Sequence, residues 1–217
     1  MGNRAIITTP ERELGLYLHW NGGRDTVEPL LKYCELKGYR SPKSDPGYAF
    51  ARMAQVMGNF FGGTLSVGIT PYTTDEAMDP GDNGIYVVDG WEIADHLRTE
   101  YDEDWKVVGM RSLEPGEEDD WHKFDDMLRA FDAAMPVGEQ LGDYLFAEEV
   151  PIGEVSVGDM AYVAKYEATP TLVAVAGIGR GIVRGRDMTG IPFADLYGSG
   201  GDNLNNYLEG PTVRVLR

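Results

Sequence analysis

Cysteine is nearly absent from this sequence, in which Cys34 is the only one among 217 residues. A single cysteine excludes a disulfide within the chain and a zinc site built on several thiolates. No apolar run approaches the about 18 residues that a membrane-spanning helix needs, and the first residues lack the apolar region of a signal peptide. The sequence therefore predicts a cytoplasmic protein.

Basic residues are also scarce, since 19 Lys and Arg stand against 36 Asp and Glu, for a formal net charge of −17. Direct binding of nucleic acid needs clustered Lys and Arg that neutralise phosphates, so the composition argues against DNA or RNA as a ligand. A protein with a pI of about 4.4 is attracted instead to basic surfaces of other proteins.

The negative charge is concentrated in residues 75–126, which hold 18 acidic residues against four basic ones, for a formal charge of −14. Such runs are usually a solvated face. The alternative is a surface whose carboxylates imitate nucleic-acid phosphates and occupy a groove lined by Lys and Arg. The candidate partner-binding residues are Asp102, Glu103, Asp104, Trp105, Glu117, Glu118, Asp119 and Asp120.

The hydrophobic pattern predicts an α+β protein, with a domain over residues 1–135, a linker over 136–150 and a second domain over 151–217. In the first domain we expect an antiparallel sheet and three helices, over 26–38, 50–61 and 118–135, the first of them capped by Thr26. The acid-rich stretch before the third helix is expected to be a loop. Short β segments separated by glycine turns predict a small SH3-like β-barrel in the second domain.

A second candidate site lies where a predicted strand leads into the first helix, at His19, Trp20, Asn21, Gly22, Gly23 and Arg24. Backbone N–H groups at such a helix start, together with a guanidinium, could bind an anion. Alternatively, the two glycines only supply the positive φ that a tight connection requires.

No pattern in the sequence assigns a catalytic residue, a metal or a cofactor. Cys34 falls on the apolar face of its predicted helix, where a thiol is structural. The acidic turn at 79–84 lacks the ligand spacing of an EF-hand, and the glycines at 177–181 lack the spacing of a dinucleotide-binding loop. The sequence thus favours a non-enzymatic protein over an enzyme.

Three segments resemble an uncharacterised protein family of phages, prophages and mobile elements of gut bacteria: GNRAIITT at 2–9, YLHWNGG at 17–23 and GNFFGG at 58–63. The resemblance covers less than half of the chain and leaves out the acidic residues 101–120 and the C-terminal domain. It implies a role in phage–host conflict or in element maintenance, and it implies no catalytic residues.

The charge and the resemblance together predict a non-enzymatic phage or mobile-element protein acting in the host cytoplasm. Its acidic surface would inhibit a basic, nucleic-acid-handling defence protein, as an anti-CRISPR or anti-restriction protein does. The alternative is a small-molecule- or nucleotide-binding protein, or an enzyme, that uses residues 19–24. A third possibility is an adapter whose C-terminal domain docks another phage protein.

Overall fold

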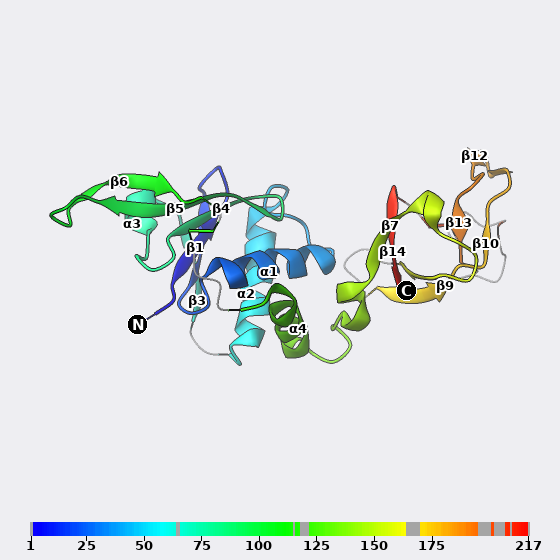
Figure 1. Ribbon diagram of the computed structural model, residues 1–217, viewed down its shortest axis with the longest axis horizontal. Helices are drawn as coiled ribbons and strands as arrows, with labels where there is room; N and C mark the ends of the chain where they lie inside the picture. Colours follow the sequence, from blue (N-terminus) through cyan, green and yellow to red (C-terminus); the bar gives the residue numbers. More distant parts are fainter. Residues whose placement is uncertain are drawn as a thin grey trace. The chain divides into compact units, whose positions relative to one another are not determined.

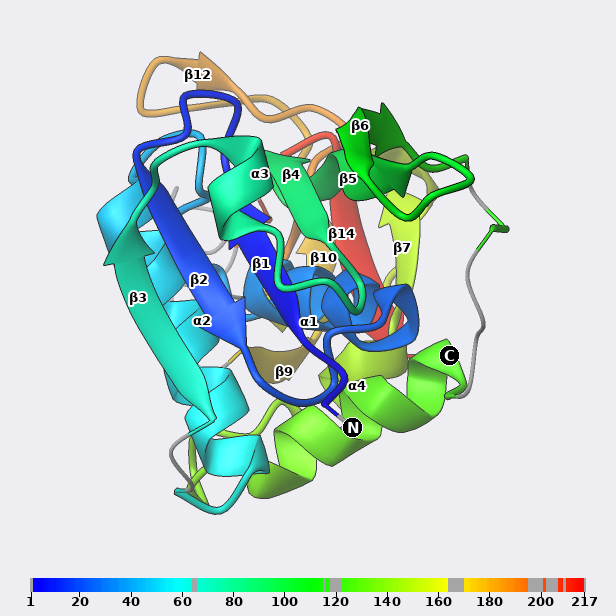
Figure 2. The same cartoon turned by 90° about the vertical axis from the view of Figure 1, so that its left-hand side faces the viewer.

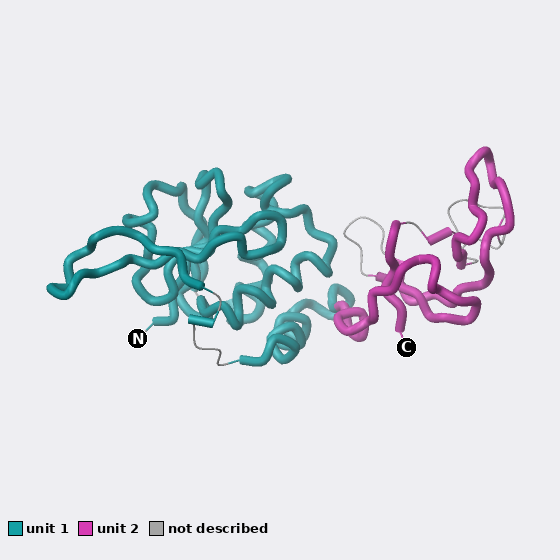
Figure 3. The backbone as a smooth tube through the Cα atoms, turned by 45° about the horizontal axis from the view of Figure 1, so that its top comes forward, with its two compact units in different colours: residues 1–140 teal, residues 141–217 magenta. Residues whose placement is uncertain are grey.

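The computed structural model describes residues 2–63, 66–114, 116–117, 122–163, 170–194, 201, 207–208 and 210–216. The chain divides into two compact units, residues 1–140 and 141–217 (Figure 3). The division falls inside the predicted linker, which contains a 3-10 helix, Gly142–Phe146, and strand β7, Glu148–Pro151. No helix in the described part of the chain is long and apolar enough to cross a membrane.

The first unit is built on a six-stranded sheet in the order β3-β2-β1-β4-β5-β6. The strands are β1 (Ala5–Thr8), β2 (Leu14–Leu18), β3 (Val67–Pro71), β4 (Ile85–Asp89), β5 (Glu92–Tyr101) and β6 (Val107–Ser112). The prediction of an antiparallel sheet was wrong at one place, because β1 and β4 pair in parallel. Parallel neighbours require a long crossover connection, and the helices between them provide it.

Helices cover both faces of this sheet unequally (Figure 2). Three of them, α1 (Arg24–Leu36), α2 (Pro46–Phe60) and α4 (Phe124–Ala134), lie on one face. The short helix α3 (Asp75–Met78) lies on the other, where Met78 packs against a buried cluster that includes Ile6. With both faces covered, the central strands β1 and β4 are apolar nearly throughout, as buried strands are.

The three predicted helices exist, with shifted boundaries. Helix α1 begins before Thr26, because the carbonyl of Gly23 accepts bonds from the N–H groups of Thr26 (3.0 Å) and Val27 (2.9 Å). Gly23 is thus the N-cap, and the prediction of a Thr26 cap was wrong. Helix α4 begins at Phe124, and the predicted helical residues 118–121 lie outside the described residues.

The acid-rich stretch expected to be a loop is partly a β-hairpin. Strand β5 continues past the end of β4, and β6 pairs with this extension, from Leu97 opposite Ser112 to Tyr101 opposite Val107. Figure 1 shows the hairpin extending beyond the rest of the sheet. The loop prediction failed here because runs of Asp and Glu, which are poor strand formers, concealed the β-branched pair Val107-Val108.

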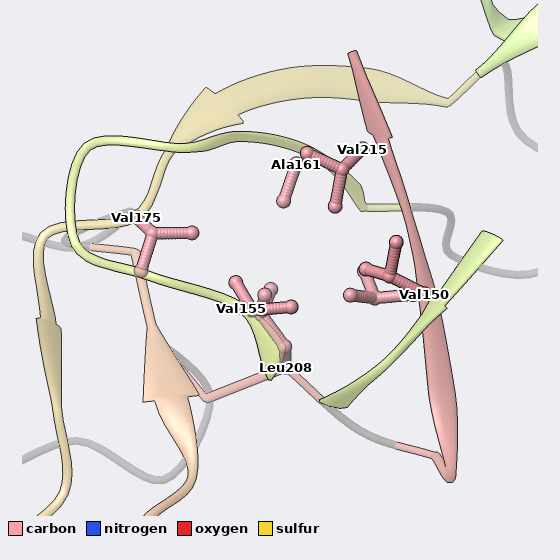
Figure 4. Close-up of a cluster of buried hydrophobic side chains, with 7 residues drawn as sticks. Val150, Val155, Ala161, Val175, Leu208 and Val215 are labelled. Carbon is pink, nitrogen blue, oxygen red and sulfur yellow. The ribbon is translucent and has the colours of Figure 1, made fainter. Parts of the chain in front are cut away.

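The second unit contains a four-stranded antiparallel sheet in the order β7-β14-β8-β9. Its further strands are β8 (Met160–Val163), β9 (Thr171–Ala174) and β14 (Thr212–Leu216), and a 3-10 turn spans Ile152–Glu154. Two small hairpins pair β10 (Gly177–Ile178) with β13 (Pro192–Phe193), and β11 (Ile182–Val183) with β12 (Arg186–Asp187). Val150, Val155, Ala161, Val175, Leu208 and Val215 converge on one small core (Figure 4).

The mixed α+β class is confirmed, whereas the SH3-like barrel is not supported. Among the described residues, none of the sheets closes into a barrel. The strands of the two small hairpins are two residues long, which is too short to extend the four-stranded sheet around a closed circuit.

Buried side chains hold α1 and α4 together in the first unit. Tyr33 is fully buried, and its hydroxyl donates a bond to Asp132 Oδ1 at 2.8 Å. Burial, followed by this bond, raises the pKa of Tyr33. The neighbouring Cys34 is fully buried as predicted, and burial raises the pKa of its thiol, so the thiol is unreactive.

We predict that Tyr33→Phe destabilises the protein by about 1–3 kcal/mol, since it withdraws the hydroxyl donor from a carboxylate that stays buried. Urea unfolding measures this loss. The control is Tyr101→Phe, which removes a hydroxyl from a half-exposed ring on the hairpin and is expected to change stability by about 0.5 kcal/mol or less. Equal effects of both substitutions would show that the Tyr33–Asp132 bond does not contribute.

Candidate functional site

The described acidic residues of 75–126 lie on several separate elements. They are distributed over α3, the β4–β5 turn, the β5–β6 hairpin and the start of α4. Several are paired with Lys or Arg: Asp75 with Arg12, Asp82 with Arg4, Asp89 with Lys43, Asp104 with Lys106, Glu117 with Arg111 and Asp126 with Arg129. Six of the 18 carboxylates of this segment are therefore balanced by a neighbouring Lys or Arg.

The candidate partner-binding residues separate into a cluster and a remainder. Asp102, Glu103, Asp104 and Trp105 lie together in the turn between β5 and β6, and all are exposed. Glu117 lies after β6, where its carboxylate accepts from Arg111 Nη1 at 3.2 Å and from the N–H of Glu114 at 2.7 Å. Glu118, Asp119 and Asp120 lie outside the described residues.

Hydrogen bonds define the conformation of this turn, residues 102–106, which we call the hairpin tip. The N–H of Trp105 donates to the carbonyl of Asp102 at 3.0 Å, and the N–H of Asp102 to the carbonyl of Lys106 at 2.9 Å. Asp102 Oδ1 accepts from the N–H groups of Asp104 and Lys106, each at 2.9 Å. The Asp102 carboxylate therefore shapes the turn, while Glu103 and Asp104 extend into solvent.

Trp105 is the most unusual residue of the tip. Its φ of 61° is left-handed, a conformation that costs a residue with a side chain roughly 1–2 kcal/mol. Its side chain is 83% exposed, and its nearest aromatic neighbour is Tyr101, with the ring centroids 6.2 Å apart. A strained backbone that presents a large apolar side chain to water is typical of a binding site.

Exposed apolar side chains continue from the tip into β6. Val107 and Val108 are 56% and 59% exposed, so that with Trp105 they form one apolar stretch beside the carboxylates. The sequence analysis missed both valines because it treated the stretch as a loop. The signal that could have revealed them was the adjacent β-branched pair, which is typical of a strand.

The connection from β2 to α1 has a different structure from the predicted anion site. The N–H of Gly22 donates to the Asn3 carbonyl at 2.8 Å and to Asn3 Oδ1 at 3.0 Å, so this amide is engaged within the protein. Asn21, and not the glycines, has the positive φ, at 55°. Gly22 is required by space instead, since a Cβ there would lie 2.7 Å from the Cβ of Ala5.

The side chains around this connection are also engaged. Arg24 lies 3.7 Å from Glu28, and the hydroxyl of Tyr17 and His19 Nδ1 are hydrogen-bonded at 2.8 Å. The carboxylate of Asp25, which is almost completely buried in the first turn of α1, contacts the N–H (3.0 Å) and Nδ1 (2.7 Å) of His122. A carboxylate already occupies this helix start, which favours a negative charge there, so the geometry does not favour a further anion. Trp20, half-exposed, packs edge-on against His19.

The second unit has a hollow of about 820 Å³ that the sequence did not reveal, lined by residues that include Ile178, Phe193 and Tyr207. The glycines at 177–181 form one of its walls. Gly179 is required by packing, because a Cβ there would lie 2.0 Å from the carbonyl oxygen of Met188. In the described part of the chain, no group of three or more His, Cys, Asp or Glu could hold a metal ion.

The chain matches no protein-family model, no curated protein and no solved structure. Inference about function therefore starts from the chain's own surface, and the hairpin tip is the surface feature that packing within the protein explains least.

We predict that Gly22→Ala destabilises the protein by about 1–3 kcal/mol, because the added methyl group overlaps Ala5 and the chain must shift. The matched control is Gly58→Ala in α2, where a Cβ meets nothing within 4 Å and the better helix propensity of alanine adds about 1 kcal/mol. Thermal unfolding of both variants measures the two effects. An unchanged melting temperature for Gly22→Ala would show that the glycine is not needed for packing.

The Arg12–Asp75 pair predicts a pH-dependent stability. The guanidinium of Arg12 lies 2.7 Å from Asp75 Oδ1, and its hydrogen bond lowers the pKa of that carboxyl. Because the folded pKa lies below the unfolded value of about 3.9, the pair stabilises the fold above that pH, and this contribution is lost as the pH falls through the folded pKa.

We expect Arg12→Gln to lower the free energy of unfolding by about 1 kcal/mol at neutral pH. The difference from the wild type is expected to persist down to about pH 4 and to be lost as the pH falls further, through the lowered pKa of Asp75. Urea unfolding across pH 2.5–7 measures this. Lys43→Gln serves as the control, because the Lys43–Asp89 pair is much more exposed. A loss for Arg12→Gln that persists unchanged into acid would contradict the assignment.

Proposed function

We propose that this chain is a non-enzymatic interaction protein of a phage or mobile element, which binds a basic surface of a nucleic-acid-handling defence protein of the host. The hairpin tip makes the contact, and the binding blocks the defence protein, as anti-CRISPR or anti-restriction proteins do. The observation that carries the proposal is Trp105, 83% exposed in the same turn as Asp102, Glu103 and Asp104.

The tip combines the two features that a protein–protein contact of this kind needs. Tryptophan is enriched among the few interface residues that supply most of the binding energy, because it buries a large apolar area. Carboxylates around it attract Lys and Arg from a distance and raise the association rate. The ion pair of Asp104 with Lys106 spans 3.6 Å between side chains that are each more than 70% exposed, so it is weak and a partner's cation can replace it.

The class of target follows from the charge and from the family resemblance. Proteins that cut or bind DNA carry grooves lined by Lys and Arg, which an acidic tip complements. The resemblance of the N-terminal segments to a phage and mobile-element family points to host defence as the setting. Because five of the other carboxylates of residues 75–126 are paired with Lys or Arg, and the exposed tryptophan lies among the acids of the turn, the proposal places the contact at the tip and not along an extended strip.

We predict that neutralising the tip with Asp102→Asn, Glu103→Gln and Asp104→Asn weakens binding to a restriction endonuclease or CRISPR effector by about tenfold or more. Asparagine at 102 keeps an oxygen that can accept the two N–H groups of the turn. Binding kinetics at about 50 and 200 mM salt, together with inhibition of DNA cleavage, measure the effect, and the loss is expected mainly in the association rate at low salt.

The matched control changes the net charge equally at exposed acids elsewhere in the first unit, with Glu11→Gln, Glu13→Gln and Glu92→Gln. This variant is expected to bind and inhibit as the wild type does. If both triple variants behave alike, only the overall charge matters and the tip is not the contact. If the wild type neither binds nor inhibits such effectors, the proposed target class is wrong.

A further inference from the structure

Strand β6 forms one edge of the six-stranded sheet, and a hydrogen bond just after the strand fixes which of its backbone groups face outward. The N–H of Leu113 donates to the carbonyl of His96 at 2.7 Å. In an antiparallel ladder such hydrogen-bonded pairs alternate with non-bonded ones, so Arg111 and Gly109 direct their backbone groups at β5. Met110 and Ser112 then direct theirs at the open edge.

A second hydrogen bond agrees with this assignment. Thr99 faces Met110 across the hairpin in a non-bonded pair, so its N–H must point away from β6. It does, because it donates to Asp79 Oδ2 at 2.8 Å on the other side of β5. The outward direction of the Met110 and Ser112 amides therefore follows from two independent contacts.

Within the strand itself, residues 107–112, β6 has little of the usual protection against pairing. In natural proteins, proline, a covering segment or charged side chains along an edge strand commonly prevent it from pairing with another chain. Strand β6, with the sequence VVGMRS, contains no proline and one charged residue, Arg111, and its first two residues are exposed valines. Such a strand can accept an extended polypeptide through main-chain hydrogen bonds.

We propose that β6 receives an extended segment of the partner as a seventh strand, and that Trp105 anchors this segment at the hairpin tip. The proposal rests on the proposed function and adds to it the form of the partner's contact: a lysine- or arginine-bearing stretch in β conformation. Successive side chains of an added strand point to opposite faces, so its apolar side chains can pack beside the exposed valines of β6, while Lys or Arg residues at the tip reach the carboxylates.

The charges along the hairpin specify where the positive residues of the partner belong. Asp102, Glu103 and Asp104 lie at the tip and Glu100 lies just before it on β5, whereas Arg98 and Arg111 form a cross-strand pair nearer the sheet. Like charges placed opposite each other destabilise a strand pair. The partner segment is therefore expected to carry Lys or Arg where it passes the tip, and neutral residues where it passes Arg111.

The left-handed backbone of Trp105 provides a test that separates binding from folding. Glycine adopts a φ of 61° without strain, so Trp105→Gly suits the turn better while it removes the anchor. If Trp105 had only a structural role, its replacement would lower the stability of the free protein. If it binds the partner, the replacement lowers the affinity for the partner and leaves the stability of the free protein unharmed.

The experiment uses a short synthetic peptide of alternating lysine and valine as the probe, with the full chain. A lysine–proline peptide keeps the charge and removes the amides that pair with a strand, and a glutamate–valine peptide reverses the charge. We expect Trp105→Gly to melt at or above the wild-type temperature and to bind the lysine–valine peptide about tenfold or more weakly. Val137→Ser, which removes an apolar side chain that is 95% exposed elsewhere in the first unit, is expected to bind as the wild type does.

Amide hydrogen exchange followed by NMR locates the contact. The peptide is expected to slow exchange at Met110 and Ser112, and to leave Ile69, on the strand at the opposite edge of the sheet, unchanged. Equal binding of the lysine–proline peptide, unaltered binding by Trp105→Gly, or no binding of the lysine–valine peptide would each overturn strand addition. The peptide experiments decide only whether β6 accepts a strand. The effector-binding experiment with the hairpin-tip acids decides the proposed function, so the failure of one proposal can be told from the failure of the other.

Discussion

The parallel pairing of β1 with β4 is the contact on which the rest of the first unit depends. It joins residues 6–8 of the chain to residues 85–87, and the intervening α1 and α2 are thereby brought against one face of the sheet. Both strands are buried on both faces, so their register is fixed by packing. Strand β5 pairs with β4 as far as Leu97, and this pairing aligns the β5–β6 hairpin. The tip of the hairpin lies beyond the residues of β5 that pair with β4.

The sequence predicted the elements whose apolar residues recur regularly. The spacing of Phe50, Met53 and Met57 is that of one face of a helix and predicted the helix over 50–61, which is α2. It could not reveal the parallel pair, because strand order depends on contacts between distant residues. The acidic candidates at the tip were predicted as residues but not as a turn, since only the paired strands bring Trp105 to the end of an arm. The glycine at 22 shows the same limit: its need for space comes from Ala5, which the local sequence does not indicate.

Charge in this protein has two separate roles. Carboxylates such as Asp75 and Asp82 lie beside arginines and tie α3 and the loop before β4 to the N-terminal segment. Those of the hairpin tip either shape the turn, as Asp102 does, or remain in water. The formal charge of the segment is therefore larger than the charge of those carboxylates that are not paired with Lys or Arg. The hairpin tip contributes a small group of carboxylates around one tryptophan.

An unprotected strand edge can also pair with the same edge of a second copy. Two copies joined through β6 in antiparallel fashion would place each acidic tip against the paired arginines of the other, whereas a parallel arrangement would bring the two tips together and be opposed by repulsion between their carboxylates. Acidic side chains beside an apolar edge are a common safeguard against aggregation. Repulsion between the carboxylates of the two tips thus opposes one mode of self-association through β6.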